Sequence, residues 1–385
     1  MARSRTKRAH VRIWASENLA SNIRQTIDRL ARCEDVQHIA IMPDVHLARG
    51  VCVGTVFATS RMIYPSTIGG DIGCGMATMA LNATGDDHPP DCKAMAQLLR
   101  HLQQAVPIQR HRGTDQLAHR RSVLPDPSRL SAPSLVRLAE TEGLRQLGSL
   151  GTGNHFLELQ HDEESRLWLM VHSGSRAMGQ EIRRQHEPAR GKGTSLGLGH
   201  LDAESEAGQH CLNDMEWART YAATSRRTML QAAGQLMGTM FGWQMLHDTL
   251  IDCDHNHITR ETHCRRELLV HRKGAMPAFP GQPGLLPGSM ATASFHVVGR
   301  GNVESLCSSA HGAGRAMSRS QARRSVSMCS LTDQLRHVHY DPERAASLRE
   351  EAPSAYKDIH QVLRNQRRLV RVTRTLTPIL SHKGA

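Results

Sequence analysis

The chain has 385 residues, enough for one large domain or two ordinary ones, and its 39% hydrophobic and 22% charged residues exclude a chain that is disordered as a whole. No apolar run reaches the roughly 18 to 20 residues that span a membrane, and the basic N-terminal stretch MARSRTKRAHVRIW lacks the apolar segment of a secretion signal, so we expect a cytoplasmic protein with no membrane contact. A formal net charge of +12 favours a polyanionic partner such as a nucleic acid.

The first part of the chain predicts one helix followed by strands and turns. Apolar residues recur at helical spacing from Leu19 to Leu30, which predicts an amphipathic helix within residues 16–33. Residues 38–62 are short apolar runs broken by proline and glycine, as is typical of strands and turns. The next stretch, PSTIGGDIGCGM at residues 65–76, is a glycine-rich loop.

The middle of the chain predicts two helices and a pair of strands. Helical spacing recurs around 92–106 and 131–146, and a proline-bearing loop at 122–133 precedes the second of these segments. The apolar runs FLEL and RLWLMVHSG then predict paired strands near 156–159 and 166–172.

Helices dominate the predictions for the rest of the chain. The Ala- and Met-rich residues 211–247 predict one long or broken helical region, and residues 268–300 return to strand and turn. We expect further helices over 312–323, after a cluster of glycines, and over 354–370. Residues 186–208 combine glycine, lysine and acidic residues with little apolar content, which favours a mobile insertion.

Strands and helices are intermixed without a regular βαβ rhythm. This pattern predicts an α/β chain of the α+β type. There is no internal repeat and no clean linker, so residues 1–385 are expected to form a single domain.

The arginines and cysteines indicate which ligands the chain could bind. Only six of the 48 basic residues are lysine, and the planar fork of arginine suits bidentate phosphate contacts. A high-GC coding bias is an alternative reason for this ratio, although it does not explain the net charge. The nine cysteines are scattered and none pair as C-x-x-C, so a metal ligand or a reactive thiol is expected rather than a disulfide framework.

Four clusters contain metal-type side chains, and three of them lie in glycine-bearing stretches. A carboxylate and a thiolate three residues apart in a tight turn can reach one metal centre, and sulfur can bridge two ions. A single histidine after a strand is more often structural, but the four clusters together have the inventory for one or two transition-metal ions. Ligand softness alone favours zinc, with manganese as the alternative. The clusters are Asp71 with Cys74, Asn154 with His155 and Glu158, His172 with Arg176, and His255 with Asn256 and His257.

Glycine-rich stretches at 284–294 and 310–314 indicate a phosphate site. They add exposed backbone N–H groups, and a helix beginning after Gly314 would add its N-terminus. The P-loop pattern and the dinucleotide fingerprint are both absent, and no lysine begins the K-x-D-G motif of lysine adenylation. A neutral histidine such as His311 can instead attack an α-phosphorus and form a phosphoramidate.

The sequence resembles the RtcB family of RNA ligases, in order and over nearly the whole chain. The motif HGAGR-x-MSR is highly specific for this family. The resemblance implies an RtcB-like fold of central layered mixed β-sheets flanked by helices, with a metal centre in a deep cleft. The matching motifs are MPDVHLARG, PSTIGGDIGCGM, LGTGNHFLEL, VHSGSR, HNHI, HRKGAMPA, LPGSMATASF, SSAHGAGRAMSR, EAPSAYKDIHQV and HKGA.

The resemblance implies an activity. Such a ligase joins RNA 3′-phosphate or 2′,3′-cyclic phosphate ends to 5′-hydroxyl ends in tRNA splicing or RNA repair, and it uses GTP and two Mn²⁺ ions. His311 matches the histidine that takes GMP from GTP and passes it on to form an RNA-ppG end. The alternatives are a non-ligating relative that binds RNA ends and a hydrolase of cyclic phosphates. The sequence leaves open whether an archease-type activator is needed as a partner. The expected oligomeric state is a monomer.

The resemblance also implies site residues, and it favours manganese over zinc. Glu158 and Lys383 match the residues that read guanine, and Arg176 matches an RNA-phosphate contact. The implied metal ligands are Asp71, Cys74 as the bridge, His155, His172 and His255. The implied guanylate pocket consists of Asn154, His155, Phe156, Leu157, Glu158, His255, Asn256, Pro287, Gly288, Ser289, Met290, Ser294, His311, Gly312, Ala313, Gly314 and Lys383.

A few positions depart from the family pattern. Arg49 lies in a turn where the family usually has lysine or tyrosine between two glycines, Ala291 replaces a usual glycine, and Ser225 replaces a usual asparagine before Arg226. None of these changes removes a metal ligand or the nucleophile, and together they favour a divergent paralogue. Aromatic residues are only 3% of the chain, so we expect arginine–phosphate contacts, steep salt dependence and modest RNA sequence preference.

Overall fold

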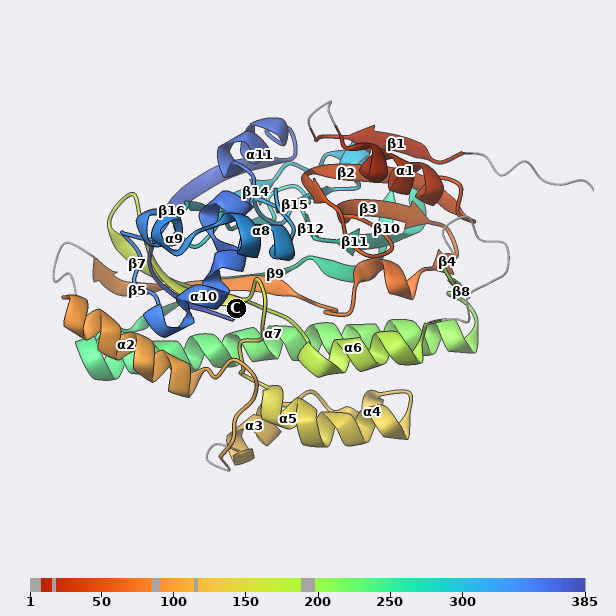
Figure 1. The fold of residues 1–385 in the computed structure, drawn as a ribbon. Helices are drawn as coiled ribbons and strands as arrows, with labels where there is room; N and C mark the ends of the chain where they lie inside the picture. Colours follow the sequence, from red (N-terminus) through yellow and green to blue (C-terminus); the bar gives the residue numbers. More distant parts are fainter. Residues whose placement is uncertain (1–7, 16–18, 85–90, 114–116, 188–197, 385) are drawn as a thin grey trace, which may run out of the picture.

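Two β-sheets stacked face to face form the centre of the molecule, and helices lie on their outer faces (Figure 1). The computed structural model describes residues 8–15, 19–84, 91–113, 117–187 and 198–384. The smaller of the two sheets has five strands, and all its neighbouring pairs are antiparallel except the parallel pair β1–β2. Its spatial order is β1 (His10–Ile13), β2 (Val36–His46), β3 (Val53–Thr59), β11 (Arg266–Lys273) and β10 (Asn256–His263).

The larger sheet has seven strands, and every neighbouring pair in it is antiparallel. Its spatial order is β13 (Pro283–Leu286), β14 (Ser294–Gly299), β16 (Val370–Lys383), β6 (Phe156–Asp162), β7 (Arg166–Ser173), β5 (Gly75–Thr84) and β9 (Met245–Asp254). Two short pairs complete the strands: β12 (Ala275–Pro277) with β15 (Ser308–Ala310), and β4 (Met62–Ile63) with β8 (Leu201–Asp202).

The helices vary from one turn to ten turns in length. None of those in the described part of the chain combines the length and apolarity that crossing a bilayer requires. They are α1 (Ser21–Leu30), α2 (Cys92–Ala105), α3 (Leu117–Val123), α4 (Pro133–Leu138), a π-helical turn (Ala139–Gly143), α5 (Leu144–Gln146), α6 (Arg176–Gln185), α7 (Glu206–Phe241), α8 (Arg319–Ser325), α9 (Met328–Gln334), α10 (Ala345–Leu348) and α11 (Ile359–Asn365).

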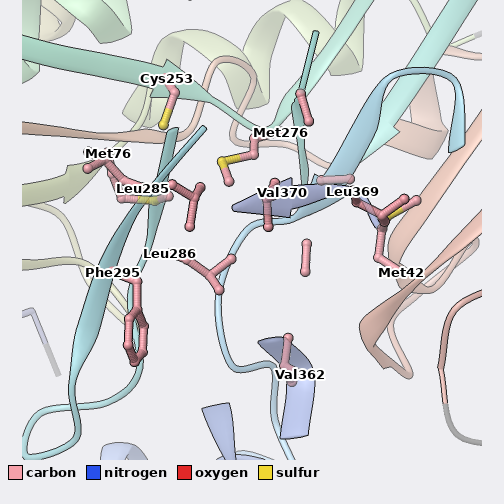
Figure 2. Close-up of a cluster of buried hydrophobic side chains, with 14 of the residues drawn as sticks. Met42, Met76, Cys253, Met276, Leu285, Leu286, Phe295, Val362, Leu369 and Val370 are labelled. Atoms are coloured by element: carbon pink, nitrogen blue, oxygen red, sulfur yellow. The ribbon is translucent and has the colours of Figure 1, made fainter. Parts of the chain in front are cut away.

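The main hydrophobic core fills the space between the two sheets. Side chains alternate along β2, so that Ala40 and Met42 face this core while Ile39 and Ile41 pack on the other face with α1. Figure 2 shows Met42 with residues of the seven-stranded sheet in the same cluster. Several of its members are methionines, whose flexible side chains fill irregular gaps in a chain with few aromatic residues.

The long helix α7 covers the opposite face of the seven-stranded sheet (Figure 1). Ser205 caps its N-terminus by accepting a hydrogen bond from the backbone N–H of Gly208 at 3.1 Å. Gly242 ends it in the left-handed region with a φ of 75°, which glycine adopts at little cost. Met229 and Leu230 of α7 pack with leucines of α2 over the sheet. The layers are therefore helices, a seven-stranded sheet, a five-stranded sheet and α1.

Most elements predicted from the sequence are confirmed. The mixed α/β fold with layered sheets is the observed one, and the predicted helices at 92–106 and 131–146 and the strand pair β6–β7 are present. The helix predicted within 16–33 begins at Ser21, although residues 16–18 lie outside the described part of the chain. The region 211–247 is one unbroken helix up to Phe241.

Two helix predictions near the C-terminus are wrong. The segment predicted as a helix over 312–323 is a loop up to Ser318, and α8 begins only at Arg319. Gly314 has a φ of 72°, which is incompatible with an α-helix. No helix N-terminus therefore follows Gly314 directly. In the segment 354–370 only Ile359–Asn365 is α-helical, because Val370 already pairs in β16.

Part of the insertion predicted at 186–208 is described. Residues 188–197 lie outside the described part of the chain. The rest includes β8, which pairs with β4, and the start of α7 at Glu206. All nine cysteines are described and are free thiols.

A buried arginine attaches α7 to the sheet. Arg226 is 2% exposed, and its Nε donates to Asp252 Oδ1 of β9 at 2.9 Å. Its Nη1 donates to the backbone carbonyls of Gly73 at 2.8 Å and Ser173 at 3.1 Å. One side chain therefore joins the helix to three segments that end at the same edge of the sheet.

Replacing Arg226 with methionine is expected to lower the free energy of unfolding by about 3–5 kcal/mol, because Asp252 would keep a buried charge without its main partner. The neighbouring Arg227 is the matched control, since it also approaches Asp252, at 3.4 Å, but is 59% exposed. Its replacement with methionine is expected to cost about 0–1 kcal/mol. Urea unfolding of both variants measures the difference, and equal losses would contradict this account of Arg226.

Candidate active site and metal centre

Strand pairing brings the predicted metal ligands to one edge of the seven-stranded sheet. Cys74 immediately precedes β5, and His172 lies opposite Met76 of β5 and Phe156 of β6 in the register of the sheet. His155 immediately precedes β6, and His255 follows β9. Residues far apart in the sequence therefore meet where four neighbouring strands begin or end.

Cys74 lies at the centre of this cluster. Its Sγ is 3.4 Å from His155 Nε2 and 3.3 Å from His172 Nε2. On one side, Asp71 Oδ2 is 3.0 Å from His155 Nε2. On the other side, the ring centroids of His172 and His255 are 5.2 Å apart. The thiol thus belongs to two potential ligand groups.

Backbone contacts select the imidazole nitrogens that can bind a metal. His155 Nδ1 lies 3.0 Å from the carbonyl oxygen of Leu150, and His172 Nδ1 lies 3.2 Å from that of Asn154. A carbonyl oxygen only accepts, so Nδ1 carries the proton in both rings and Nε2 presents its lone pair to the cluster. Carbonyl contacts of this kind orient the histidine ligands of many metal sites.

Burial controls the charge of the cluster. It holds the pKa values of His172 and His255 well below the usual range, and neighbouring histidines add to this effect. Burial and the nearby Asp71 carboxylate raise the pKa of the Cys74 thiol well above its ordinary value. The imidazoles are therefore neutral, which suits metal binding, whereas the thiol must release its proton when a metal binds.

The donor set fits one or two metal ions. The ligand atoms of Cys74, His172 and His255 lie within 4.8 Å of one another, and so do those of Asp71, Cys74 and His155. His255 Nδ1 is buried and has no hydrogen-bond partner among the described residues. A buried polar atom without a partner destabilises the fold unless a bound ligand interacts with it. Because both groups contain Cys74, its sulfur is the atom that could bridge two ions.

His311 faces this cluster from the neighbouring loop. Its ring centroid is 4.5 Å from that of His255, and its Nδ1 lies 2.7 Å from Oδ2 of Asp44, a side chain with no solvent exposure on β2. Since the carboxylate accepts, Nδ1 carries the proton and Nε2 is free to act as a nucleophile. A Cβ atom at Gly314 would overlap the backbone carbonyl of Asp44, so glycine permits this close approach.

A cavity of about 310 Å³ connects His311 with the metal cluster. All five predicted metal ligands line it, together with most of the predicted pocket residues. These pocket residues are Asn154, His155, Phe156, Glu158, His255, Asn256, Pro287, Gly288, Ser289, His311, Gly312, Ala313, Gly314 and Lys383.

Three predicted pocket residues do not line the cavity. Leu157 points to the opposite face of β6, where it packs under α2 and α7. Met290 is buried among residues of the α8–α10 region. Ser294 lies behind the cavity wall, where its hydroxyl contacts Gln160 Nε2 at 3.4 Å, and Gln160 in turn donates to Glu158 at 2.8 Å.

Glu158 and Lys383 are two buried charged residues in the wall of the cavity. Burial raises the pKa of Glu158 to about 7, although Lys383 and hydrogen bonds from Gln160 and Ser381 oppose this rise. Lys383 Nζ lies 3.5 Å from Glu351 Oε2 and donates to the carbonyl of Asn154 at 3.3 Å. A carboxylate and an amine in the wall of one cavity can bind a planar ligand that carries both N–H donors and a carbonyl acceptor.

Arg176 lies next to the cavity rather than in its lining. Its backbone N–H donates to Asp71 Oδ1 at 3.1 Å, and its Nη2 donates to the carbonyl of Ile108 at 3.2 Å. Its φ of 57° is in the left-handed region. A Cβ at Gly151 would overlap its guanidinium group, so the predicted RNA-phosphate contact is packed beside the loop that precedes His155.

Sequence reasoning missed several residues of this site. Asp44 is the most important, and its signal was a carboxylate within the apolar strand sequence IAIMPDV. His46 and Lys273 also line the cavity, as do Arg315, Arg319 and Tyr356.

Metal binding can be tested through the shared sulfur. After dialysis, Cys74→Ala is expected to retain little of the transition metal that the wild type binds. At a metal concentration one hundred times the dissociation constant, binding should stabilise the wild type by about 2.7 kcal/mol, and the variant should lack this gain. In the wild type, metal affinity should rise with pH, because binding displaces the thiol proton. Elemental analysis and thermal unfolding with and without a chelator measure both effects.

The control for this experiment is Cys211→Ala, which removes another buried thiol from α7 without touching the ligand groups. Its metal content should equal that of the wild type. An unchanged metal content and stability gain in the Cys74 variant would contradict the assignment of the cluster.

Comparisons with known proteins identify the family of the chain. The family model described as tRNA-splicing ligase RtcB matches residues 26–384. The RNA-splicing ligase RtcB of Escherichia coli is 34% identical, with 98% of both chains covered. The RNA-splicing ligase RtcB of Mycobacterium bovis is 30% identical over 89% of this chain and 96% of its own, and the tRNA-splicing ligase RtcB of Methanococcus maripaludis is 28% identical over 90% and 88%. The chain therefore belongs to the RtcB family and is an RNA ligase.

Proposed function

We propose that the chain joins RNA 3′-phosphate or 2′,3′-cyclic phosphate ends to 5′-hydroxyl ends, using GTP and Mn²⁺, through a guanylylated His311. The observation that carries the proposal is that one cavity contains both a histidine with a free Nε2 and a cluster of metal ligands. A module that only binds RNA ends has no need for this combination. The RNA would be an intermediate of tRNA splicing or a broken strand under repair.

The proposed metal ligands are Asp71, Cys74, His155, His172 and His255, and the two Mn²⁺ ions that they would hold would neutralise phosphate charge on the nucleotide and the RNA. Asp44 accepts the Nδ1 proton of His311 and keeps Nε2 available for attack. Glu158 accepts N–H groups of guanine and Lys383 donates to its carbonyl, so the pair selects GTP over ATP.

The proposed reaction has three transfers. His311 Nε2 attacks the α-phosphorus of GTP, forming a P–N bond as the bond to pyrophosphate breaks. A 3′-phosphate oxygen of the first RNA then attacks the same phosphorus, the P–N bond breaks, and the imidazole is restored. Finally the 5′-hydroxyl oxygen of the second RNA attacks the activated 3′-phosphate and GMP leaves. A cyclic phosphate end is first hydrolysed to a 3′-phosphate.

Guanylylation is the direct test of this mechanism. Wild-type protein incubated with labelled GTP and Mn²⁺ should form an acid-labile covalent GMP adduct, and His311→Ala should form none. Asp44→Asn should slow adduct formation by about 10²–10⁴-fold, because it weakens the hydrogen bond that fixes the tautomer of His311. His247→Ala, which changes an exposed histidine on β9, serves as the control and should react normally.

A folded wild-type protein that forms no adduct at any Mn²⁺ concentration would contradict the ligase mechanism. RNA with a cyclic phosphate end and a 5′-hydroxyl end provides a second measurement. A joined product supports ligation, whereas conversion to a 3′-phosphate without joining would favour the cyclic phosphate hydrolase.

The raised pKa of Glu158 predicts a pH dependence of GTP binding. The carboxylate needed to accept guanine N–H groups is fully present only above pH 7, because burial raises this pKa to about 7. At subsaturating GTP, the guanylylation rate should therefore fall as the pH drops below 7, approaching tenfold per pH unit.

Glu158→Gln tests this prediction with a matched side chain. The variant should bind GTP more weakly at pH 8 and should lose this pH step. The rate of adduct formation between pH 5.5 and 8.5 is the measurement. Identical pH profiles of the variant and the wild type would show that Glu158 is not the titrating group.

A further inference from the structure

An open cleft of about 1060 Å³ lies beside the cavity of the proposed active site. The two spaces share the side chain of Arg319. Arginines dominate the charged groups in the cleft, and no aromatic side chain of Phe, Tyr or Trp lines it among the described residues. The arginines are Arg110, Arg112, Arg145, Arg319 and Arg344, and we call this space the arginine cleft.

One wall of the arginine cleft is held by backbone hydrogen bonds. The carbonyls of Pro107 and Ile108 accept from the N–H groups of Leu150 and Gly151 at 2.9 and 2.8 Å. His111 N donates to the carbonyl of Arg145 at 2.9 Å. The segment that carries Arg110 and Arg112 is therefore fixed along α5 and along the loop that precedes His155, so its arginines occupy defined positions.

The cleft has an excess of positive charge. Two carboxylates, Asp341 and Glu350, line it with the five arginines. Outside the lining, Glu142 pairs with Arg110 at 2.9 Å and Glu351 lies 3.7 Å from Arg319, so the arginines still outnumber the carboxylates around them. Glu350 already forms an ion pair with Arg323, which lies outside the cleft, and Asp341 accepts a hydrogen bond from Gln103 at 2.7 Å. Burial lowers the pKa values of His111 and His382 to about 4, so these two histidines add no charge at neutral pH.

The arginine cleft leads directly to the reacting groups. The Arg319 guanidinium lies over Gly153, where a Cβ atom would overlap it. Arg176, beside the metal cluster, donates to the carbonyl of Ile108 in the wall of the cleft. A chain lying in the cleft would therefore reach the loop that carries Asn154 and His155.

A second outer cleft, of about 920 Å³, also shares Arg319, but its lining is more apolar. It includes Leu19, Met317 and the half-exposed Leu47, and its charged groups other than Arg319 are Arg315, Lys357 and Asp358. Of the two openings, the arginine cleft is the better match for a polyanion.

We propose that the arginine cleft binds the ribose-phosphate backbone of one of the two RNA strands to be joined. The proposal rests on the proposed ligase function, which requires two strand ends to meet near His311. Arginine forks bind phosphates bidentately, and the absence of aromatic stacking groups predicts little preference for base sequence. Both the 3′-phosphate strand and the 5′-hydroxyl strand offer this chemistry.

The experiment uses the double variant Arg112→Glu/Arg145→Glu, which reverses two exposed charges outside the proposed catalytic machinery. The control is Arg265→Glu/Arg371→Glu, which makes the same change in net charge at two exposed positions that line none of the three spaces. Fluorescence anisotropy measures the binding of two labelled single-stranded RNAs, one with a 3′-phosphate end and one with a 5′-hydroxyl end, between 50 and roughly 200 mM salt.

The cleft variant is expected to bind at least one of the two RNAs about 10–100-fold more weakly at low salt. Its plot of log affinity against log salt should be shallower by about 0.7 for each lost phosphate contact. The RNA that is affected identifies the strand in the cleft, and an equal loss for both means that either can enter. The control variant should bind both RNAs like the wild type.

Wild-type affinity and salt slope for both RNAs in a folded cleft variant, or equal losses in the control variant, would overturn the proposal. Guanylylation by GTP and Mn²⁺ is measured on the same samples and should be unchanged in the cleft variant. A wild type that binds RNA through the cleft but forms no GMP adduct would contradict the proposed function and not the cleft, so the two failures are distinguishable.

Discussion

The burial of a thiol among imidazoles is the constraint on which the site depends. Cys74 lies between His155 and His172 at the edge of a sheet, and all three side chains are almost fully buried at the wall of the cavity. Such a group of side chains is costly to bury unless an ion compensates it. The fold meets this cost with four adjacent strands whose register aligns the ligands before any metal binds.

Charged side chains behind the ligands hold the same edge together. Burial opposes ionisation of Asp254, but His257 and Arg219 outweigh it and hold its pKa well below the usual range. Because Asp254 precedes His255, this carboxylate fixes the turn that carries a metal ligand. Arg226 does the same for the turn before Cys74. His255 and Cys74 are therefore positioned by charged side chains that do not line the cavity.

Periodicity and motif together anticipated most of the fold and much of the site. Strands such as β6 and β7 were predictable because their apolar runs are bounded by turn residues. The loop after His311 was not, since Gly314 adopts a left-handed backbone only because the carbonyl of Asp44 packs against it. That contact joins residues about 270 apart in sequence, which no local pattern reports.

The same limit applies to individual side chains. Asp44 could be seen as an acid in an apolar strand, but its role depends on a contact with His311 that only the tertiary structure creates. Conversely, family motifs include Leu157, Met290 and Ser294, which the structure places behind the cavity wall. A motif records residues that the site needs, whether they touch the ligand or support a neighbour that does.

The position of β16 has a consequence for how the protein is made. This strand is the last in the chain, yet it lies inside the seven-stranded sheet, between β14 and β6, and carries Lys383 into the cavity. During translation, the sheet is divided into two parts until residues 370–383 leave the ribosome. A nascent chain can already contain the Cys74 cluster and His311 but still lacks Lys383 in the cavity wall. The cavity therefore reaches its complete lining only when β16 has joined the two parts of the sheet.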